Sequence, residues 1–145
     1  VRFLLFDRVI SVEPGRRITT VKTFSMQDEH LNGHFPRRAL VPGTMVLEAM
    51  LQSLGWLVMR THEFEVLPFF SMLEDLVVPA ELRPGVRLEI TGDLLSTNAK
   101  GSMGRAEATV DGVVTASIGR VIYGHHRAAH PEEARRRFAC YGDLA

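Results

Sequence analysis

The sequence predicts an α+β fold in which an antiparallel β-sheet wraps around one long central α-helix. Three observations support this prediction. A nearly continuous apolar segment in the first half of the chain predicts one buried helix. Short segments bounded by turn residues predict strands. The dipeptide Asp111-Gly112 is typical of a tight hairpin, and hairpins join antiparallel strands.

The 145 residues, 46% of them hydrophobic, suit a single domain with a substantial core. We expect this domain to cover residues 1–124, and residues 125–145 to form a polar C-terminal tail with room for a short helix from Pro131. The 17 acidic and 17 basic residues cancel, which argues against a nucleic-acid partner. The lone cysteine, Cys140, cannot form an intramolecular disulfide, and we see no export signal, so the expected location is cytoplasmic.

The elements follow in a clear order along the chain. Two strands are predicted on either side of the turn Glu13-Pro14-Gly15, at residues 8–12 and 16–24. Residues 25–40 are mostly polar and predict a loop, of a length that is usually functional inside a compact domain. The helix then runs from Pro42-Gly43-Thr44 to about Arg60. Four further strands are predicted at residues 68–78, 86–95, 102–110 and 113–123.

The predicted helix is apolar nearly all around its circumference, so other elements must surround it. The apolar segment, Ala39 to Met59, is long enough for a membrane span. However, Glu48 lies near its centre, where a carboxylate is costly, and Pro42-Gly43 shortens the helix. We therefore expect a buried central helix and no membrane span.

Two side chains are candidates for acid–base chemistry. Glu48 is the only ionisable residue between Ala39 and Met59, and burial would leave its carboxyl neutral and able to donate a proton. The alternatives are that Glu48 reaches solvent or pairs with an arginine. His34, in the loop before the helix, has the side-chain type that can take a proton near neutral pH, although a loop histidine is more often structural or solvated. Together they would supply the base and the acid that dehydration of a 3-hydroxyacyl group needs.

The start of the helix is a third candidate element. The free backbone N–H groups and the positive end of the helix dipole at Pro42-Gly43-Thr44 suit a thioester carbonyl that gains negative charge. Glycine at position 43 would let a ligand approach closely. By itself, however, Pro-Gly at this place indicates only where a helix begins.

These residues resemble the active-site segment of the 3-hydroxyacyl-acyl-carrier-protein dehydratases of the FabZ and FabA group. The resemblance rests on Gly33-His34-Phe35-Pro36, Val41-Pro42-Gly43, and Glu48-Ala49-Met50 with Gln52. The fourteen-residue separation of His34 from Glu48 agrees with that motif. The similarity extends over roughly residues 8–123, and it implies a hot-dog fold.

The resemblance also implies roles for single residues. His34 of one subunit would be the base and Glu48 of the other subunit the acid, in a homodimer or a trimer of dimers. The backbone N–H of Gly43 would polarise the thioester carbonyl. Gln52, one turn after Glu48, would orient its carboxyl or simply pack. Further expected substrate contacts are Phe35, Pro42 and Met45. Glutamate rather than aspartate at position 48 resembles the FabZ type, which dehydrates without moving the double bond.

The expected reaction converts a (3R)-hydroxyacyl thioester on acyl carrier protein to the trans-2-enoyl thioester and water, in fatty-acid or related polyketide or polyene lipid biosynthesis. This reaction needs no cofactor, and none is expected. No metal is expected either, because no Cys or carboxylate spacing supports a site at His125, His126 and His130. Arg37 and Arg38 would contact the carrier protein or its phosphopantetheine phosphate, unless they are only solvated. A substrate tunnel would run along the helix, lined by Met45, Met50, Leu54, Phe69 and Phe70.

Two other functions remain compatible with this sequence. Hot-dog folds also hold acyl-thioester hydrolases, in which the same helix end polarises a thioester while a carboxylate activates water. The chain can also be a non-catalytic partner subunit of a heterodimeric dehydratase. Retention of both His34 and Glu48 argues against the second alternative.

Overall fold

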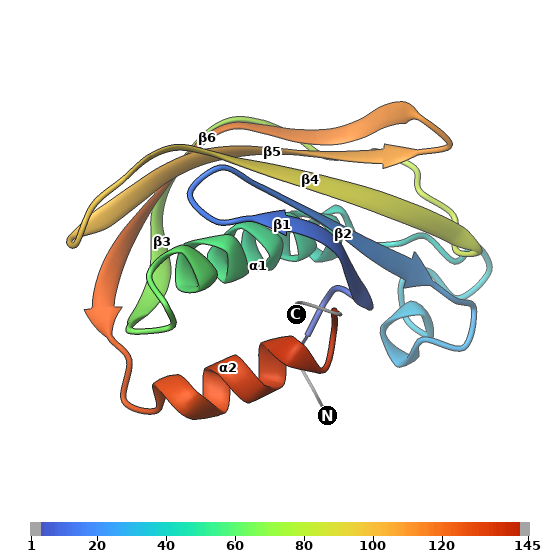
Figure 1. Ribbon diagram of the computed structural model, residues 1–145. Coiled ribbons are helices and arrows are strands. Elements are labelled where there is room, and N and C mark those ends of the chain that lie inside the picture. The colour runs from blue at the N-terminus through green and yellow to red at the C-terminus, as the bar shows by residue number, and fades with distance from the viewer. Residues whose placement is uncertain (1–3, 143–145) are drawn as a thin grey trace.

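In the computed structural model, which describes residues 4–142, a six-stranded antiparallel sheet curls over one long helix (Figure 1). The helices are α1 (Gly43–Thr61) and α2 (Pro131–Ala139), with a short 3₁₀ turn at Glu29–Leu31. The strands are β1 (Arg8–Glu13), β2 (Arg17–Phe24), β3 (Val66–Val77), β4 (Val86–Thr97), β5 (Gly101–Val110) and β6 (Val113–Arg127). This arrangement confirms the predicted hot-dog fold.

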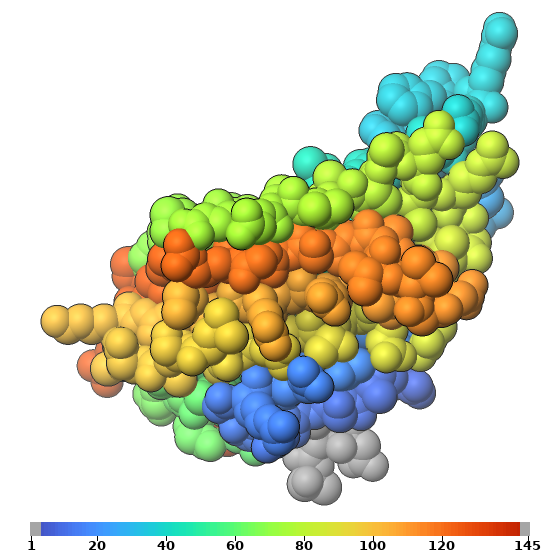
Figure 2. Space-filling model, turned by 90° about the horizontal axis from the view of Figure 1, so that it is seen from above, coloured from blue at the N-terminus to red at the C-terminus, as the bar shows by residue number. Residues whose placement is uncertain are grey.

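The strand order in the sheet is β1-β2-β4-β5-β6-β3, which places β1 and β3 at opposite edges. Figure 2 shows this order on the outer face of the sheet, with β3 in yellow-green along one edge and the blue strands along the other. The predicted hairpin at Asp111-Gly112 joins β5 to β6. Its residues have φ angles of 50° and 80°, the positive values that a tight two-residue hairpin turn requires.

One side of α1 packs against the concave face of the sheet. Four of its side chains are completely buried there: Val46, Met50, Leu54 and Leu57. Leu54 comes so close to the strands that a Cβ atom on Gly92 would lie 2.8 Å from its Cδ2 atom. A buried polar pair, Thr20 and Ser53, also joins sheet and helix through hydroxyl groups 2.7 Å apart. Ser53 donates to the Ala49 carbonyl, so Thr20 is the donor within the pair.

The chain after β6 folds back under α1, on the side away from the sheet (Figure 1). β6 continues to Arg127, past residue 124, and α2 begins at Pro131. Phe138 of α2 is buried and stacks on Trp56 of α1, with ring centroids 5.2 Å apart. Within residues 4–142, neither helix has the length and hydropathy that a membrane span requires.

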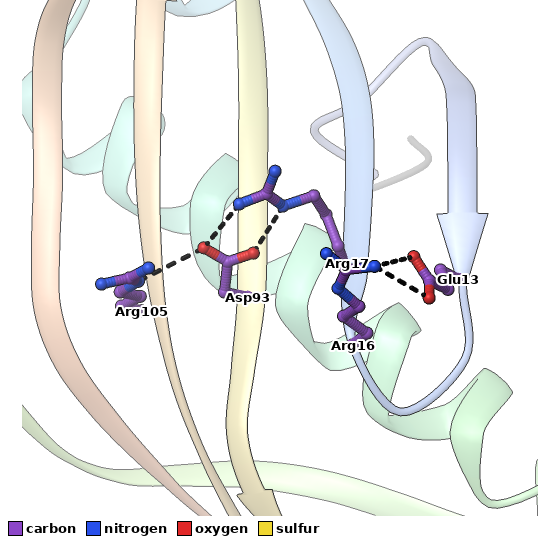
Figure 3. A network of polar contacts seen from close by, with 5 residues as sticks. All are labelled: Glu13, Arg16, Arg17, Asp93 and Arg105. Atoms are coloured by element: carbon purple, nitrogen blue, oxygen red, sulfur yellow. Dashed lines mark hydrogen bonds and ion pairs between the residues drawn. The ribbon is translucent and has the colours of Figure 1, made fainter.

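The outer face of the sheet carries a network of charged residues (Figure 3). Asp93 on β4 accepts hydrogen bonds from Arg17 on β2 and Arg105 on β5, with a shortest distance of 2.6 Å. The hydrogen bond from Arg17 is the main cause that lowers the pKa of Asp93. Because Gly92 faces α1, its neighbour Asp93 faces the other way. The network therefore connects β2, β4 and β5 and lies on the face of the sheet away from α1.

A second polar cluster fixes the C-terminal end of α1 to the β4–β5 hairpin. A chain of three hydrogen bonds runs through it. His62 bonds to Thr97 at 2.7 Å, Thr97 to Ser102 at 2.7 Å, and Ser102 to His125 at 2.9 Å. The two imidazole rings pack edge to face, with centroids 4.9 Å apart. Burial, and then the neighbouring His62, lower the pKa of His125.

We expect this cluster to make the fold sensitive to acid. A histidine whose pKa is lowered in the folded state is protonated more readily when the chain unfolds. The stability it contributes is therefore present above its unfolded pKa of about 6.5 and is lost as the pH falls below that value. The melting temperature, measured from pH 7.5 down to about pH 5, should fall less in His125→Gln than in the unchanged protein. The exposed neighbour His126→Gln is the control, and an equal fall in all three proteins would contradict the assignment.

Candidate active site

His34 lies in the loop between β2 and α1, where two hydrogen bonds to Leu40 hold it. Its Nδ1 atom lies 2.8 Å from the carbonyl oxygen of Leu40, and its own carbonyl accepts a hydrogen bond from the Leu40 N–H, also at 2.8 Å. A carbonyl oxygen can only accept, so Nδ1 carries the hydrogen. In the neutral ring Nε2 is then an acceptor. The ring is half-buried and stacks on Phe35, and the peptide bond between them is cis.

Glu48 lies in the second turn of α1 and is half-buried. Its Oε1 atom accepts a hydrogen bond of 2.9 Å from the Gln52 side-chain amide. Of the two roles expected for Gln52, orienting the carboxyl and plain packing, the structure therefore shows the hydrogen bond, which the four-residue spacing allows. The Gln52 carbonyl oxygen in turn accepts from the backbone N–H of Leu5 at 2.9 Å. Because that backbone group can only donate, the orientation of the amide is settled, and its NH₂ group must face Glu48.

The chain before β1 therefore takes part in the site, which the sequence did not indicate. Leu5 lies 47 positions from Gln52, and a backbone N–H leaves no signal in the amino-acid pattern. On the other side of the helix, Tyr123 of β6 donates a hydrogen bond of 2.8 Å to the Leu51 carbonyl. Burial, followed by the negative charge of Glu48, raises the pKa of Tyr123 far above its usual value. Tyr123 is thus a buried hydrogen-bond donor that stays protonated.

At the start of α1, the N–H groups of Met45 and Val46 donate to the Pro42 carbonyl, and those of Gly43 and Thr44 come before the first acceptor that the helix offers. Gly43 begins the helix and Pro42 precedes it without a side-chain cap, and no acidic residue lies in the first turn. The first N–H groups of a helix have no intrahelical acceptors, and they carry the positive end of the helix dipole. Glycine at this position also has a packing role, since a Cβ atom here would lie 3.0 Å from Cγ2 of Val78.

Within the described part of one chain, His34 is held next to the start of α1 and Glu48 lies in its second turn, but the two side chains are not in contact through a polar interaction. No hydrogen bond or ion pair connects His34 to Glu48 among residues 4–142. In the preceding loop, Phe35 is 54% exposed, and it borders a shallow hollow of about 230 Å³ together with Pro36 and Arg37. Arg38 forms an ion pair of 2.5 Å with Glu81.

The predicted lining of a substrate tunnel needs a correction. Met50 and Leu54 are completely buried against the sheet, so the prediction that they line the tunnel is wrong. On a helix that is apolar all around, the sequence does not show which apolar face meets the sheet. Met45 is half-buried at the start of α1, while Phe69 and Phe70 lie on the edge strand β3 and are about half exposed. No group of three or more His, Cys, Asp or Glu side chains within the described part of the chain is placed to hold a metal ion.

Comparison with known proteins assigns this chain to a family. The family model for the FabA-like domain matches residues 1–119. The chain belongs to the FabA-like family. Among curated proteins, the 3-hydroxyacyl-[acyl-carrier-protein] dehydratases FabZ of Exiguobacterium sibiricum and Bacillus cytotoxicus are similar to it. Each is 34% identical to this FabA-like chain over 113 residues, which cover 77% of the chain and 81% and 78% of the two relatives.

Solved structures with low sequence identity share the fold. A Streptococcus mutans protein bound to acetyl CoA superposes with a TM-score of 0.65 at 12% identity, covering 88% of this FabA-like chain and 93% of that one. The dehydratase heterocomplex ApeI:P from Xenorhabdus doucetiae gives a TM-score of 0.64 at 18% identity, covering 92% and 89%. The fluoroacetyl-CoA thioesterase FlK also gives 0.64, at 14% identity, covering 88% and 97%.

The double role of Gln52 leads to a stability prediction. Gln52→Leu keeps the size of the side chain but leaves the half-buried Leu5 N–H without its acceptor, so the free energy of unfolding should fall by about 1–2 kcal/mol. The exposed Gln27→Leu should stay within about 0.5 kcal/mol of the unchanged protein. Urea unfolding of the three proteins measures both values. A Gln52 variant as stable as the Gln27 control would show that the hydrogen bond from Leu5 to Gln52 contributes nothing to folding.

Proposed function

We propose that this FabA-like chain dehydrates 3-hydroxyacyl groups that are bound as thioesters to acyl carrier protein. The observation that carries the proposal is the bond between His34 Nδ1 and the Leu40 carbonyl, because it leaves Nε2 as the acceptor that a catalytic base requires. Glu48, oriented by Gln52, supplies the second ionisable group near the same helix end. The activity for which the FabZ relatives are named supports the substrate class.

In the proposed reaction, His34 Nε2 removes the proton from C2 of the (3R)-hydroxyacyl group. Negative charge then develops on the thioester oxygen, where the N–H of Gly43 and the dipole of α1 stabilise it. Glu48 in its protonated form donates to the C3 hydroxyl, which leaves as water. The C2–C3 double bond forms as that C–O bond breaks, and the trans-2-enoyl thioester remains. Proton exchange with solvent restores neutral His34 and protonated Glu48.

The proposed contact with a second subunit is the edge strand β3. Within residues 4–142 this strand pairs only with β6, so the backbone groups of its other edge have no strand partner there. Six of its apolar side chains are exposed. These are Leu67, Phe69, Phe70, Met72, Leu76 and Val77. Such an exposed apolar edge favours association with another copy. We propose a dimer joined at β3, in which His34 of one subunit completes a site with Glu48 of the other.

The carrier protein would approach the loop that contains His34. Arg37 is exposed there and forms no ion pair within the described part of the chain, whereas Arg38 is already paired with Glu81. Of the two, Arg37 is therefore the better candidate for meeting an acidic carrier surface or the phosphate of its arm. Fatty-acid synthesis and related polyketide or polyene lipid synthesis both remain compatible with this substrate class.

The reaction is tested by mass spectrometry of a 3-hydroxyacyl group on carrier protein. The unchanged protein should convert the substrate to a product that has lost one water. Each of His34→Ala and Glu48→Gln should lower the rate by roughly a hundredfold or more, because each removes one of the two proton-transfer groups. Circular dichroism spectra of the variants control for folding.

Two other results would replace the proposal. Release of free acid with an unloaded carrier thiol would identify an acyl-thioester hydrolase, as the structural similarity to FlK allows. A folded protein that is inactive alone, and active only with a second dehydratase-like chain, would identify a partner subunit. The heterocomplex among the structural neighbours makes that mixing experiment worthwhile.

A mixing experiment tests the shared site. His34→Ala and Glu48→Gln are each inactive in the proposed scheme, but a dimer with one subunit of each kind contains one intact site. If subunits exchange at random, mixing equal amounts should restore about one quarter of the normal activity, since half of the dimers are mixed and each has one working site. A double variant mixed with the unchanged protein is the control. If the mixture of single variants stays inactive although the subunits exchange, the site lies within one subunit.

A further inference from the structure

A groove of about 920 Å³ lies between α1 and α2, on the side of α1 away from the sheet. Apolar side chains from four parts of the chain contribute to its lining: Leu4, Trp56, Met59, Leu67, Ala134 and Tyr141. The charged residues that border it, including Arg136 and Arg137, are exposed positions of α2 and so form its rim. The groove thus has an apolar interior and a charged margin.

This groove begins beside the proposed acid. Gln52 borders it and donates a hydrogen bond to Glu48. Trp56 and Met59 follow on the same side of α1, at spacings of four and three residues. From Gln52 to Met59 the helix rises about 10 Å. A ligand with its reacting carbons at Glu48 would enter the groove only with atoms well beyond those carbons.

The wall formed by α2 is firmly attached. Phe138 packs against Trp56 and Phe64, with ring centroids 5.2 and 5.6 Å away. Tyr141 packs edge to face on Phe6, at 5.8 Å. Its carbonyl also accepts a hydrogen bond of 2.6 Å from the N–H of Val9. The family match ends at residue 119, so this wall lies outside the part of the chain that the family model describes.

We propose that α2 is a specificity element that forms one wall of the acyl-binding site, and that it makes the enzyme prefer long aliphatic acyl thioesters to short ones. The inference rests on the proposed function, which places the thioester carbons next to Glu48. An aliphatic chain is the proposed occupant because the apolar interior of the groove begins next to Glu48, where the reacting carbons would lie. Each methylene that enters the groove strengthens binding about fourfold.

The position of Trp56 allows a direct binding test. It is the single tryptophan of the chain and borders the groove, so its fluorescence reports what lies there. Dodecanoyl pantetheine with bromine on its terminal carbon, a short-range quencher, should quench this fluorescence in a saturable way. Butyryl pantetheine with terminal bromine should not. Absence of saturable quenching by the long probe would overturn the proposal, whether or not the protein is a dehydratase.

Two matched substitutions on α2 connect the groove to selectivity. Ala134 borders the groove, while Ala139 of the same helix is exposed and does not. Ala134→Phe should weaken binding of the long probe about tenfold or more, and lower kcat/KM for 3-hydroxydodecanoyl substrate by a similar factor. In the same variant, kcat/KM for 3-hydroxybutyryl substrate should change less than about twofold. Ala139→Phe should change neither the binding of the long probe nor kcat/KM for either substrate.

The role of α2 in specificity and the dehydratase activity would be contradicted by different results. Equal losses for both chain lengths in Ala134→Phe, or no loss for either, would overturn the role of α2 while dehydration by His34 and Glu48 stood. Quenching that is normal in the unchanged protein and weakened by Ala134→Phe, without loss of water from any substrate, would overturn the dehydratase and retain an acyl-binding groove.

Discussion

The structure depends on covering α1, a helix that is apolar nearly all around its circumference. A sheet can bury only one side of a helix, and here it buries Val46, Met50, Leu54 and Leu57 completely. The other side needs separate cover, which the N-terminal segment and α2 provide through Phe6 and Phe138. Burying each large side chain contributes roughly 1.5–3 kcal/mol, so leaving one side of this helix open would be costly.

Glu48 and Gln52 lie where this cover is incomplete. A polar group among apolar neighbours is tolerated when directional bonds satisfy it, and both side chains meet that condition through one chain of hydrogen bonds from Leu5. The same principle governs His34, whose ring is bonded to the Leu40 carbonyl. A backbone carbonyl therefore orients His34 directly, whereas Glu48 is oriented through the Gln52 side chain, which a backbone N–H holds in turn.

Local patterns in the sequence predicted the parts of the structure that short-range physics determines. Asp111-Gly112 formed its hairpin, and the Glu48–Gln52 hydrogen bond is one of the two roles that the helical spacing left open for Gln52. Long-range packing was not predictable in this way. The docking of α2 rests on a stacked pair 82 positions apart, Trp56 and Phe138, and nothing near either residue indicates the other. The edge position of β3 likewise depends on pairing with the last strand.

The fold alone does not separate a dehydratase from a thioester hydrolase, because both activities occur among its structural neighbours. Their chemistry differs in what must be placed around the thioester. Hydrolysis needs one base beside a water molecule that attacks the carbonyl carbon. Dehydration needs two proton-transfer groups, one at C2 and one at the C3 oxygen. This chain has a histidine whose Nε2 is left as an acceptor and a carboxyl oriented by an amide, both near the helix end that would hold the carbonyl. Under the proposed function, these two oriented groups would serve the two proton transfers of dehydration, one at C2 and one at the C3 oxygen.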